Sequence, residues 1–347
     1  MTRDGRGSIS VRLVEQALLA FTSPQRPAED LLRQLGMATI DLCDAEARVE
    51  VAQYSRLWRR LARHFDDEFF GMDARRLRAG SFAFVCRAAM GQPTLERALR
   101  VALEFFALAF ERFRADLQRS QSLAEVVLLE ADERPLRAFG YFTFWMLLHG
   151  LACWLTGRRI PLLAVELRCA EPAYTDDYRV MFSDNLRFAQ GRTRIIFAAA
   201  ALDLPVRRSE AELQAFLAQA PANILVRYRD TGSLASRIKA QLRALPAEQW
   251  PSGEQLARQY CLSPSTLRRR LAEAGLPYQA IKDLVRQEMA TLWLADATLT
   301  YTQIAERLGF AEASSFYRAF RKWTGTNPGQ YRALILGAPI GENGQAD

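Results

Sequence analysis

The chain has 347 residues, of which 50% are hydrophobic and 24% are charged. This is the composition of an ordinary globular protein, so a disordered chain and a fibrous repeat are both excluded. The length predicts two domains, or one large domain and a small one. With 46 basic and 39 acidic residues the net charge is +7, which favours an acidic partner without identifying it.

The first 27 residues are interpreted as an N-terminal extension. Glu15 and Gln16 interrupt their apolar stretch, so no secretion signal is expected and the protein is predicted to be cytoplasmic. A second stretch, residues 138–157, is uncharged over the length of a membrane span. Because it contains Thr143, His149 and three glycines, we interpret it as a buried helix and expect no membrane contact.

Residues 28–220 are predicted to form an α+β domain. Apolar residues recur at helical spacing in residues 57–65 and 95–113, and a helix is expected over 209–219. Short apolar or β-branched runs typical of strands interleave with these helices, at residues 124–129, 162–167 and 193–197. The arginines of this domain are expected to lie on its surface.

Catalytic and metal-binding chemistry find little support in the sequence. Five cysteines lie far apart without a C-x-x-C pair, and only two histidines are present. Neither a disulfide framework nor a metal centre can be assembled from this spacing. There is also no hydrolase-type triad and no phosphate-binding glycine loop. We therefore expect no enzymatic activity, no metal and no cofactor.

The character of the chain changes after the α+β domain. Pro221 and a polar stretch predict a linker over residues 221–233. Residues 234–336 show helical periodicity throughout, and residues 337–347 are interpreted as a flexible tail. Residues 231–335 hold 14 basic and 8 acidic side chains, so +6 of the total charge is concentrated in this helical region.

The helical region contains an internal repeat. Residues of the first copy recur 48 or 49 positions later: Leu256-Ala257, Tyr260, Leu262, Leu267 and Leu271 as Ile304-Ala305, Leu308, Phe310, Phe316 and Phe320. Each copy is predicted to be a helix, a tight turn and a second helix. Between them an apolar stripe predicts a connecting helix of about seventeen residues, formed by Ile281, Leu284, Val285, Met289 and Leu292.

Capping residues and glycines bound these helices. In the first copy Ser252 or Gly253 opens the first helix, and Ser263 caps the second with Pro264 in its first turn. Gly275 is expected to end that helix. In the second copy Thr300 and Gln303 form a capping box, Gly309 supplies the turn, and a helix from about residue 313 ends before Gly325.

The second helix of each copy leaves a polar and basic face free, which predicts binding to double-stranded DNA. The expected contacts are Ser265, Arg268 and Arg269 in the first copy, and Ser314, Ser315 and Arg318 in the second. Arg269 and Arg318 occupy equivalent positions, and an arginine can donate two hydrogen bonds to a guanine edge. The competing interpretation is a helical bundle whose arginines are only exposed to solvent. The matched arginines in the two copies favour DNA binding over this interpretation.

The second copy resembles the signature of the AraC/XylS family of bacterial transcription regulators. The resemblance rests on Ile304-Ala305, Leu308-Gly309-Phe310, Ser315-Phe316, Arg318-Ala319-Phe320-Arg321, Trp323, Gly325, Pro328 and Tyr331-Arg332. The first copy agrees, except that Cys261 stands where the family usually has glycine. Segments such as Thr94-Leu95-Glu96-Arg97-Ala98-Leu99 and Leu202-Asp203-Leu204-Pro205-Val206 are similar to the arabinose-binding-like sensor domain of these regulators.

The resemblance implies an effector-responsive transcription regulator, most simply an activator that contacts RNA polymerase at the nucleoid. Its two recognition helices would enter successive major grooves, and its N-terminal domain would bind a small molecule and support a homodimer. A seventeen-residue connecting helix spans about 25 Å, and successive grooves lie about 34 Å apart. By the same resemblance Ala313 stands where some members read a base with a polar side chain.

The uncharged stretch also holds candidate ligand-binding residues. Tyr141, Trp145 and His149 share one helical face and are candidates to line a pocket for an apolar or amphipathic effector. An ordinary core stripe is the competing interpretation. A constitutive or architectural DNA-binding protein, whose N-terminal domain only dimerises, is the alternative function. A DNA-repair alkyltransferase would need a zinc-binding cysteine cluster that this sequence lacks.

Overall fold

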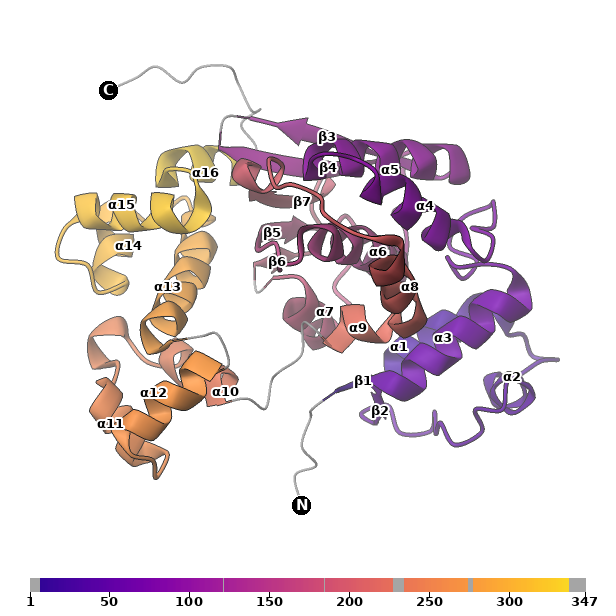
Figure 1. The fold of residues 1–347 in the computed structure, drawn as a ribbon, viewed down its shortest axis with the longest axis horizontal. Helices are drawn as coiled ribbons and strands as arrows, with labels where there is room; N and C mark the ends of the chain where they lie inside the picture. The colour runs from indigo at the N-terminus through magenta and orange to yellow at the C-terminus, as the bar shows by residue number, and fades with distance from the viewer. Residues whose placement is uncertain (1–6, 121, 184, 227–233, 274–276, 337–347) are drawn as a thin grey trace. The chain divides into compact units, whose positions relative to one another are not determined.

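The computed structural model describes residues 7–120, 122–183, 185–226, 234–273 and 277–336. The described residues divide into two compact units, residues 7–226 and residues 234–336. The first combines helices with a mixed sheet, and the second is helical throughout its described residues (Figure 1). This confirms the expected fold class. The predicted tail, residues 337–347, lies outside the described residues, as does Gly275.

The N-terminal unit is built on a five-stranded sheet with the order β3-β4-β7-β5-β6. The strands are β3 (Phe113–Arg119), β4 (Leu123–Glu130), β5 (Leu162–Glu166), β6 (Leu186–Arg187) and β7 (Thr193–Ala198). Neighbours pair antiparallel except β5 and β6, which run parallel. The three apolar runs expected to be strands lie at its centre, in β4, β7 and β5.

Helix α6 (Ala138–Thr156) forms the centre of this domain, with every residue from 138 to 155 buried. It contacts α1 (Val11–Leu18), α4 (Ser81–Met90) and α5 (Leu95–Ala109). Although α6 is long and apolar enough to cross a membrane, its apolar window is fully buried by protein. The uncharged stretch is therefore a core helix, as expected.

The remaining elements of the unit surround this core. They are a two-stranded sheet of β1 (Ser8–Ser10) and β2 (Arg48–Glu50), the helices α2 (Ala28–Gln34), α3 (Val51–Phe65), α7 (Thr175–Met181), α8 (Glu210–Gln219) and α9 (Ala222–Val226), and the 3-10 turns η1 (Leu19–Phe21) and η2 (Ala199–Ala201). One expected helix is shorter than predicted. α5 ends at Ala109, and Phe113 starts β3 because its ring packs on Phe110 and Phe144 instead of continuing the helical face.

Residues 8–18 pack into the N-terminal domain, so their interpretation as an extension was wrong. Strand β1 pairs with β2, and Ser10 caps α1 by accepting a hydrogen bond from the amide of Arg12. One side of α1 is fully buried, at Val11, Leu13, Val14, Ala17 and Leu18. An eight-residue helix with Glu15 and Gln16 on its outer side has too short a pattern to stand out in the sequence.

The predicted linker also begins too early. Residues 222–226 form α9, which contacts α3 and α8 and buries Ile224 and Leu225. A Cβ atom at Gly150 of α6 would lie 2.7 Å from Ile224 Cγ2, so the two helices touch where glycine leaves room. The N-terminal domain therefore extends at least to the end of α9.

One arginine of this domain lies in its interior, against expectation. Arg194 of β7 is 2% exposed, and its guanidinium donates to Glu125 of β4 at 2.9 Å and to Glu166 of β5 at 2.5 Å. Glu166 also accepts from Arg187. A buried charge is tolerated only when it is paired and hydrogen-bonded, and this network across neighbouring strands meets that condition.

The C-terminal unit consists of two helical halves on either side of a connecting helix (Figure 1). Its elements are α10 (Leu234–Arg243), η3 (Ala247–Gln249), α11 (Gly253–Gln259), α12 (Pro264–Glu273), α13 (Tyr278–Leu294), α14 (Tyr301–Arg307), α15 (Ala313–Thr324) and α16 (Pro328–Ile335). The connecting helix α13 has the predicted 17 residues. Its buried face differs from the predicted apolar stripe at one position, because Leu292 is 54% exposed and Leu294 is buried instead.

Candidate nucleic-acid interface

The first half of the C-terminal unit is a helix-turn-helix formed by α11 and α12. Ser252 and Gln255 make a reciprocal capping box at the start of α11. Ser263 caps α12 by accepting from the amide of Thr266 at 3.2 Å. Leu256 and Leu267 are buried between the helices, so one side of α12 packs inward and its opposite side remains available.

The second half repeats this arrangement in α14 and α15. Thr300 and Gln303 form the expected capping box of α14. Phe316 and Phe320 of α15 are fully buried, and their rings lie 5.7 Å apart in an edge-to-face contact. Helix α15 ends at the left-handed Gly325, as predicted.

The two turns have the same backbone geometry, although one contains cysteine and the other glycine. Cys261 and Gly309 both adopt positive φ, 54° and 75°. The amide of Leu262 donates to the carbonyl of Ala257 at 2.9 Å, and in the second copy Phe310 donates to Ala305 at 2.9 Å. The departure from glycine at position 261 therefore leaves the turn intact.

Helix α12 exposes all three residues predicted for it. Ser265, Arg268 and Arg269 are exposed, and Leu267 points into the core between them. The hydroxyl of Ser263 lies 3.0 Å from that of Ser265 and 2.8 Å from that of Thr266. The N-terminus of this recognition helix thus presents a cluster of hydroxyl groups next to two arginines, a combination suited to phosphate and base contacts.

Helix α15 presents a more constrained surface. Arg318 is exposed and donates to the hydroxyl of Ser315 at 3.2 Å, so the half-buried serine holds the arginine in place. Ser314 is exposed, but its hydroxyl donates to Glu312 at 3.0 Å. Binding of Ser314 to DNA would have to exchange this hydrogen bond, and Glu312 would bring a negative charge close to the phosphates.

Two further cations extend the exposed face of α15. Arg321 and Lys322 follow Arg318 by three and four residues, which places them on the same side of the helix one turn later. Both are exposed. Comparison of the two copies did not identify these two cations, because the first copy has Ala272 and a glutamate at the corresponding positions. Their helical spacing from Arg318 is the sequence signal that could have identified them.

Other basic residues of the region have structural roles instead. Arg332 donates to the carbonyl oxygens of Leu294 and Leu299, and Lys239 and Arg243 both pair with Glu288 of α13. Net charge alone therefore overstates the number of cations that are free to bind DNA.

Arg286 of α13 connects the two helix-turn-helix halves. Its guanidinium lies 4.9 Å from the ring centre of Trp250, which precedes α11, and 5.5 Å from that of Phe310, which precedes α15. Its Nε donates to the carbonyl of Leu308 at 3.0 Å, and burial lowers the pKa of the guanidinium. The same side chain therefore contacts residues of both helix-turn-helix halves.

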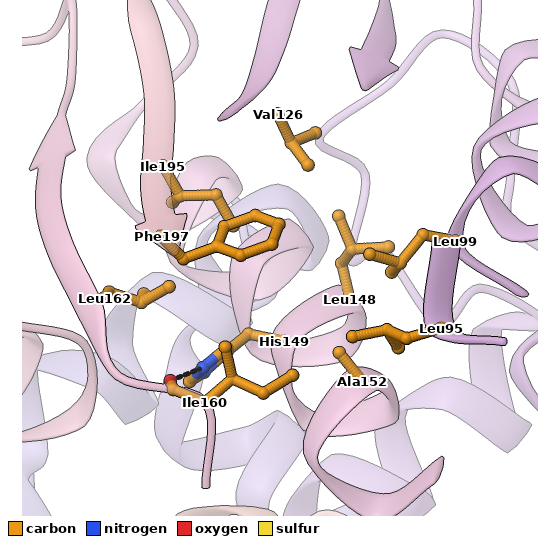
Figure 2. Close-up of a pocket in the computed structure, with 10 residues that line it drawn as sticks. All are labelled: Leu95, Leu99, Val126, Leu148, His149, Ala152, Ile160, Leu162, Ile195 and Phe197. Carbon is orange, nitrogen blue, oxygen red and sulfur yellow. Dashed lines mark hydrogen bonds between the residues drawn. The ribbon is translucent and has the colours of Figure 1, made fainter. Parts of the chain in front are cut away.

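The three candidate effector residues lie on the buried core helix α6. Tyr141 and Trp145 are fully buried, and the Tyr141 hydroxyl donates to Glu130 at 2.6 Å. Burial and this hydrogen bond raise the pKa of Tyr141. His149 lines a cavity, where its ring nitrogen Nε2 lies 2.8 Å from the carbonyl oxygen of Ile160 (Figure 2).

This cavity lies between α5, α6 and the sheet (Figure 2). Apart from His149 its lining is apolar: Leu95, Leu99, Val126, Leu148, Ala152, Ile160, Leu162, Ile195 and Phe197. Its free volume of about 10 Å³ is close to what one water molecule needs. An effector would therefore have to separate α5 from the sheet in order to enter.

The sequence and these two repeated units define a helix-turn-helix DNA-binding protein with a separate α+β domain. Residues 26–206 match the family model of the arabinose-binding domain of AraC transcription regulators, and residues 256–334 match a helix-turn-helix domain model. The first match covers more than half of the chain, and it agrees with the resemblance seen in the sequence. The chain belongs to the AraC family of DNA-binding transcription regulators.

Individual relatives agree with this assignment. The chain is 28% identical to the ornithine utilization regulator of Pseudomonas aeruginosa over 74% of this chain and 76% of that protein. It is 26% identical to an uncharacterized HTH-type transcriptional regulator of Mycobacterium tuberculosis over 88% and 90%. The HTH-type transcriptional regulator VqsM of P. aeruginosa is 36% identical over 30% of this chain and 31% of its own length.

Among solved structures, the transcriptional regulator CdpR from P. aeruginosa aligns with 92% of this chain and 96% of its own. The sequence identity is 23% and the TM-score is 0.29.

Proposed function

We propose that this protein is an effector-responsive activator that reads two successive major grooves with α12 and α15. The observation that carries the proposal is the pair of turns with matching hydrogen bonds, each followed by a helix that exposes an equivalent arginine, Arg269 or Arg318. Ser265, Arg268, Ser314 and Ser315 are the accompanying contacts. Helix α13, about 25 Å long, covers most of the distance of about 34 Å between neighbouring major grooves.

Binding to selected DNA tests this proposal. A duplex selected from a random pool by the full-length protein serves as the specific probe, and a shuffled duplex of the same length serves as the non-specific probe. Arg269→Ala and Arg318→Ala should each weaken specific binding by about 1 to 3 kcal/mol and leave non-specific binding nearly unchanged. Arg270→Ala is the matched control, since Arg270 is exposed on α12 but lies about 100° around the helix from Arg269.

Two results would contradict the groove assignment. An equal loss on both probes would make the arginines phosphate contacts, and an unchanged affinity would remove them from the interface. A binding site in which bases are specified over only one helical turn would show that a single recognition helix reads DNA.

The proposed effector is an apolar or amphipathic small molecule that enters beside His149. The apolar lining of the cavity supports this class of ligand. Thermal unfolding of the full-length chain with an organic-solvent extract of cell metabolites, and separately with the aqueous fraction, tests it. Stabilisation by the organic fraction, lost in Leu148→Trp, is expected because the larger ring would fill the cavity. If neither fraction stabilises the protein, constitutive DNA binding becomes the better description.

The remaining parts of the proposal follow from family membership. As an activator the protein would contact RNA polymerase, act at the nucleoid in the cytoplasm, and bind its operator as a homodimer. Transcription in vitro from a promoter that carries the selected site, with and without this protein, distinguishes activation from repression.

A further inference from the structure

We propose that Arg137, at the start of α6, binds the carboxylate of a small organic acid together with the hydroxyls of Tyr54, Tyr174 and Tyr178. This inference goes beyond the proposed function, because it assigns to the N-terminal domain a second ligand, whose charge an apolar cavity would not accept. The two sites lie apart in the fold. Arg137 precedes His149 on α6, and the distance between them along the helix axis is about 18 Å.

Arg137 is a half-buried cation with which no acid pairs in the described part of the chain. Its guanidinium donates to the amide oxygen of Gln16 at 3.2 Å and to the thioether sulfur of Met72 at 3.1 Å. Glu15, the neighbour of Gln16, is already paired with Arg12 at 2.9 Å. Burial lowers the pKa of Arg137. Because a thioether is a weak acceptor, a carboxylate that replaced Met72 would form stronger, charge-assisted hydrogen bonds with this guanidinium.

Two other arginines that the same domain partly or fully encloses do have carboxylate partners. Arg168 donates to Glu130 at 2.7 Å, and Arg194 donates to two glutamates of the sheet. An enclosed charge is costly unless it is paired. Arg137 departs from this pattern, and an anion from outside the chain would supply the counter-ion that it lacks.

Three tyrosine side chains lie close together next to Arg137. Tyr54 of α3 and Tyr178 of α7 are 0% and 1% exposed, and their hydroxyls have no hydrogen-bond partner among the described residues. Tyr174 is half-buried, and its ring centre lies 5.7 Å from that of Tyr178. Arg137 interacts electrostatically with the hydroxyls of Tyr174 and Tyr178. Burial raises the pKa of all three tyrosines, so each hydroxyl keeps its proton at neutral pH and can donate it to a carboxylate oxygen.

These groups favour a small organic acid over an inorganic anion. One guanidinium balances one negative charge, and the neutral hydroxyls supply further donors to the carboxylate oxygens. Helix α6 begins here without a side-chain cap, and the partial positive charge of a helix N-terminus also attracts an anion. The ring of Tyr178 packs edge-to-face on Phe142 at 4.8 Å, so the body of the ligand would lie against aromatic side chains.

Isothermal titration calorimetry of the full-length protein tests the proposal with hexanoate as the probe. The reference ligands are hexanamide, which has the same chain without the charge, and sulfate, which is an anion without an apolar body. Hexanoate should bind at least about tenfold more tightly than either. Arg137→Gln should weaken hexanoate binding at least about tenfold, because it removes the charged donor. Arg56→Gln, which removes an exposed cation of α3, is the matched control and should leave hexanoate binding unchanged.

Tyr178→Phe distinguishes a ligand site from a structural hydrogen bond. This variant should weaken hexanoate binding several-fold and leave the thermal midpoint of the ligand-free protein unchanged or higher, because the deleted hydroxyl has no partner in the described chain. Tyr141→Phe is the matched comparison. Its hydroxyl donates to Glu130 at 2.6 Å, so this variant should lower the midpoint and leave hexanoate binding unchanged.

Several results would overturn the assignment. They are no binding of hexanoate to the wild type, equal affinity for hexanoate and either reference ligand, and unchanged affinity in Arg137→Gln. A lower midpoint with unchanged affinity in Tyr178→Phe would make that hydroxyl structural and also overturn it. Loss of hexanoate binding in Leu148→Trp would place the acid in the cavity beside His149, which overturns this second site and leaves the proposed effector cavity in place.

Discussion

The two helix-turn-helix units share their backbone hydrogen bonds but differ in what holds them together. The first packs an aliphatic core, with Leu256, Leu267 and Leu271 buried together with α10 and α13. The second has an aromatic core, in which Phe310, Phe316, Phe320, Trp323 and Tyr331 form a chain of ring contacts. The same turn geometry is thus compatible with different packing, because it needs only a residue at positive φ, a small residue at the helix crossing and an apolar anchor.

The largest expected effect comes from the aromatic core. Phe316→Ala should cost about 3 to 5 kcal/mol of the free energy of unfolding of the C-terminal unit, because the ring is fully buried among three others. Denaturant unfolding of the full-length chain, followed by hydrogen exchange in α14 and α15, measures this loss. Leu292→Ala on exposed α13 surface is the control and should change stability by less than about 0.5 kcal/mol. A loss of only that size for Phe316→Ala would refute the contrast between the two cores.

A substitution at Arg286 should uncouple the two helix-turn-helix halves of the C-terminal unit. Arg286→Met removes the hydrogen bond to Leu308 and both cation–π contacts, so we expect a loss of about 2 kcal/mol in stability. Arg286→Lys should recover part of it. DNA binding measures the coupling of the two halves separately from stability. When three base pairs are inserted between the two recognised segments of the duplex, the loss of affinity should be smaller for Arg286→Met than for the wild type. An equal penalty would limit Arg286 to a role in stability.

Gly309 tests the turn of the second unit. A Cβ atom there would lie 3.1 Å from Ala247 Cβ, and φ is 75°. Gly309→Ala should therefore destabilise the unit by about 1 to 2 kcal/mol, as expected for a side chain in the left-handed region. Gly191→Ala, with no atoms within 4 Å of its Cβ and no positive φ, is the control in the other domain. Equal effects from both substitutions would contradict the requirement for glycine in the turn.

Cys261 should show the opposite sign and the smallest effect. Cys261→Gly relieves a non-glycine residue at φ 54° while increasing the entropy of the unfolded chain, so we expect a net stabilisation of about 0.5 kcal/mol. The midpoint of thermal unfolding reports it, with Cys43→Gly, another exposed cysteine, as the comparison. A clear destabilisation by Cys261→Gly would mean that the thiol contributes a contact that outweighs the strain of the turn.

The sequence predicted the C-terminal unit in more detail than the N-terminal one. The capping box at Thr300, the turn residue Gly309 and a connecting helix of about 17 residues were predicted from local pattern, while the capping box at Ser252 was found only in the structure. These features are local, since each depends on residues within one or two helical turns. In the N-terminal domain the central strands and the buried α6 were also predicted, the strands from short apolar or β-branched runs and α6 from a long uncharged stretch.

Features that depend on distant partners were missed or misassigned. Helix α1 was taken as an extension and α9 as part of a linker, because both are too short to show a clear periodicity. The burial of Arg194 depends on Glu125 and Glu166, which are 69 and 28 residues away along the chain. Tyr141, Trp145 and His149 share a helical face of α6, in which residues 138–155 are all buried, and the binding of an effector at this face stays a prediction.

The amino-acid sequence by itself was enough to indicate the family and the two-domain composition of helix and sheet, and to predict the two surfaces proposed to meet DNA, because caps, turns and helical spacings act through neighbouring residues. Tertiary structure decided which short segments complete the core, which arginines are interior or bridge the two units, and which apolar side chains remain at the surface. These outcomes depend on contacts between residues far apart in the chain, and the free energy of such contacts has no signature in local spacing.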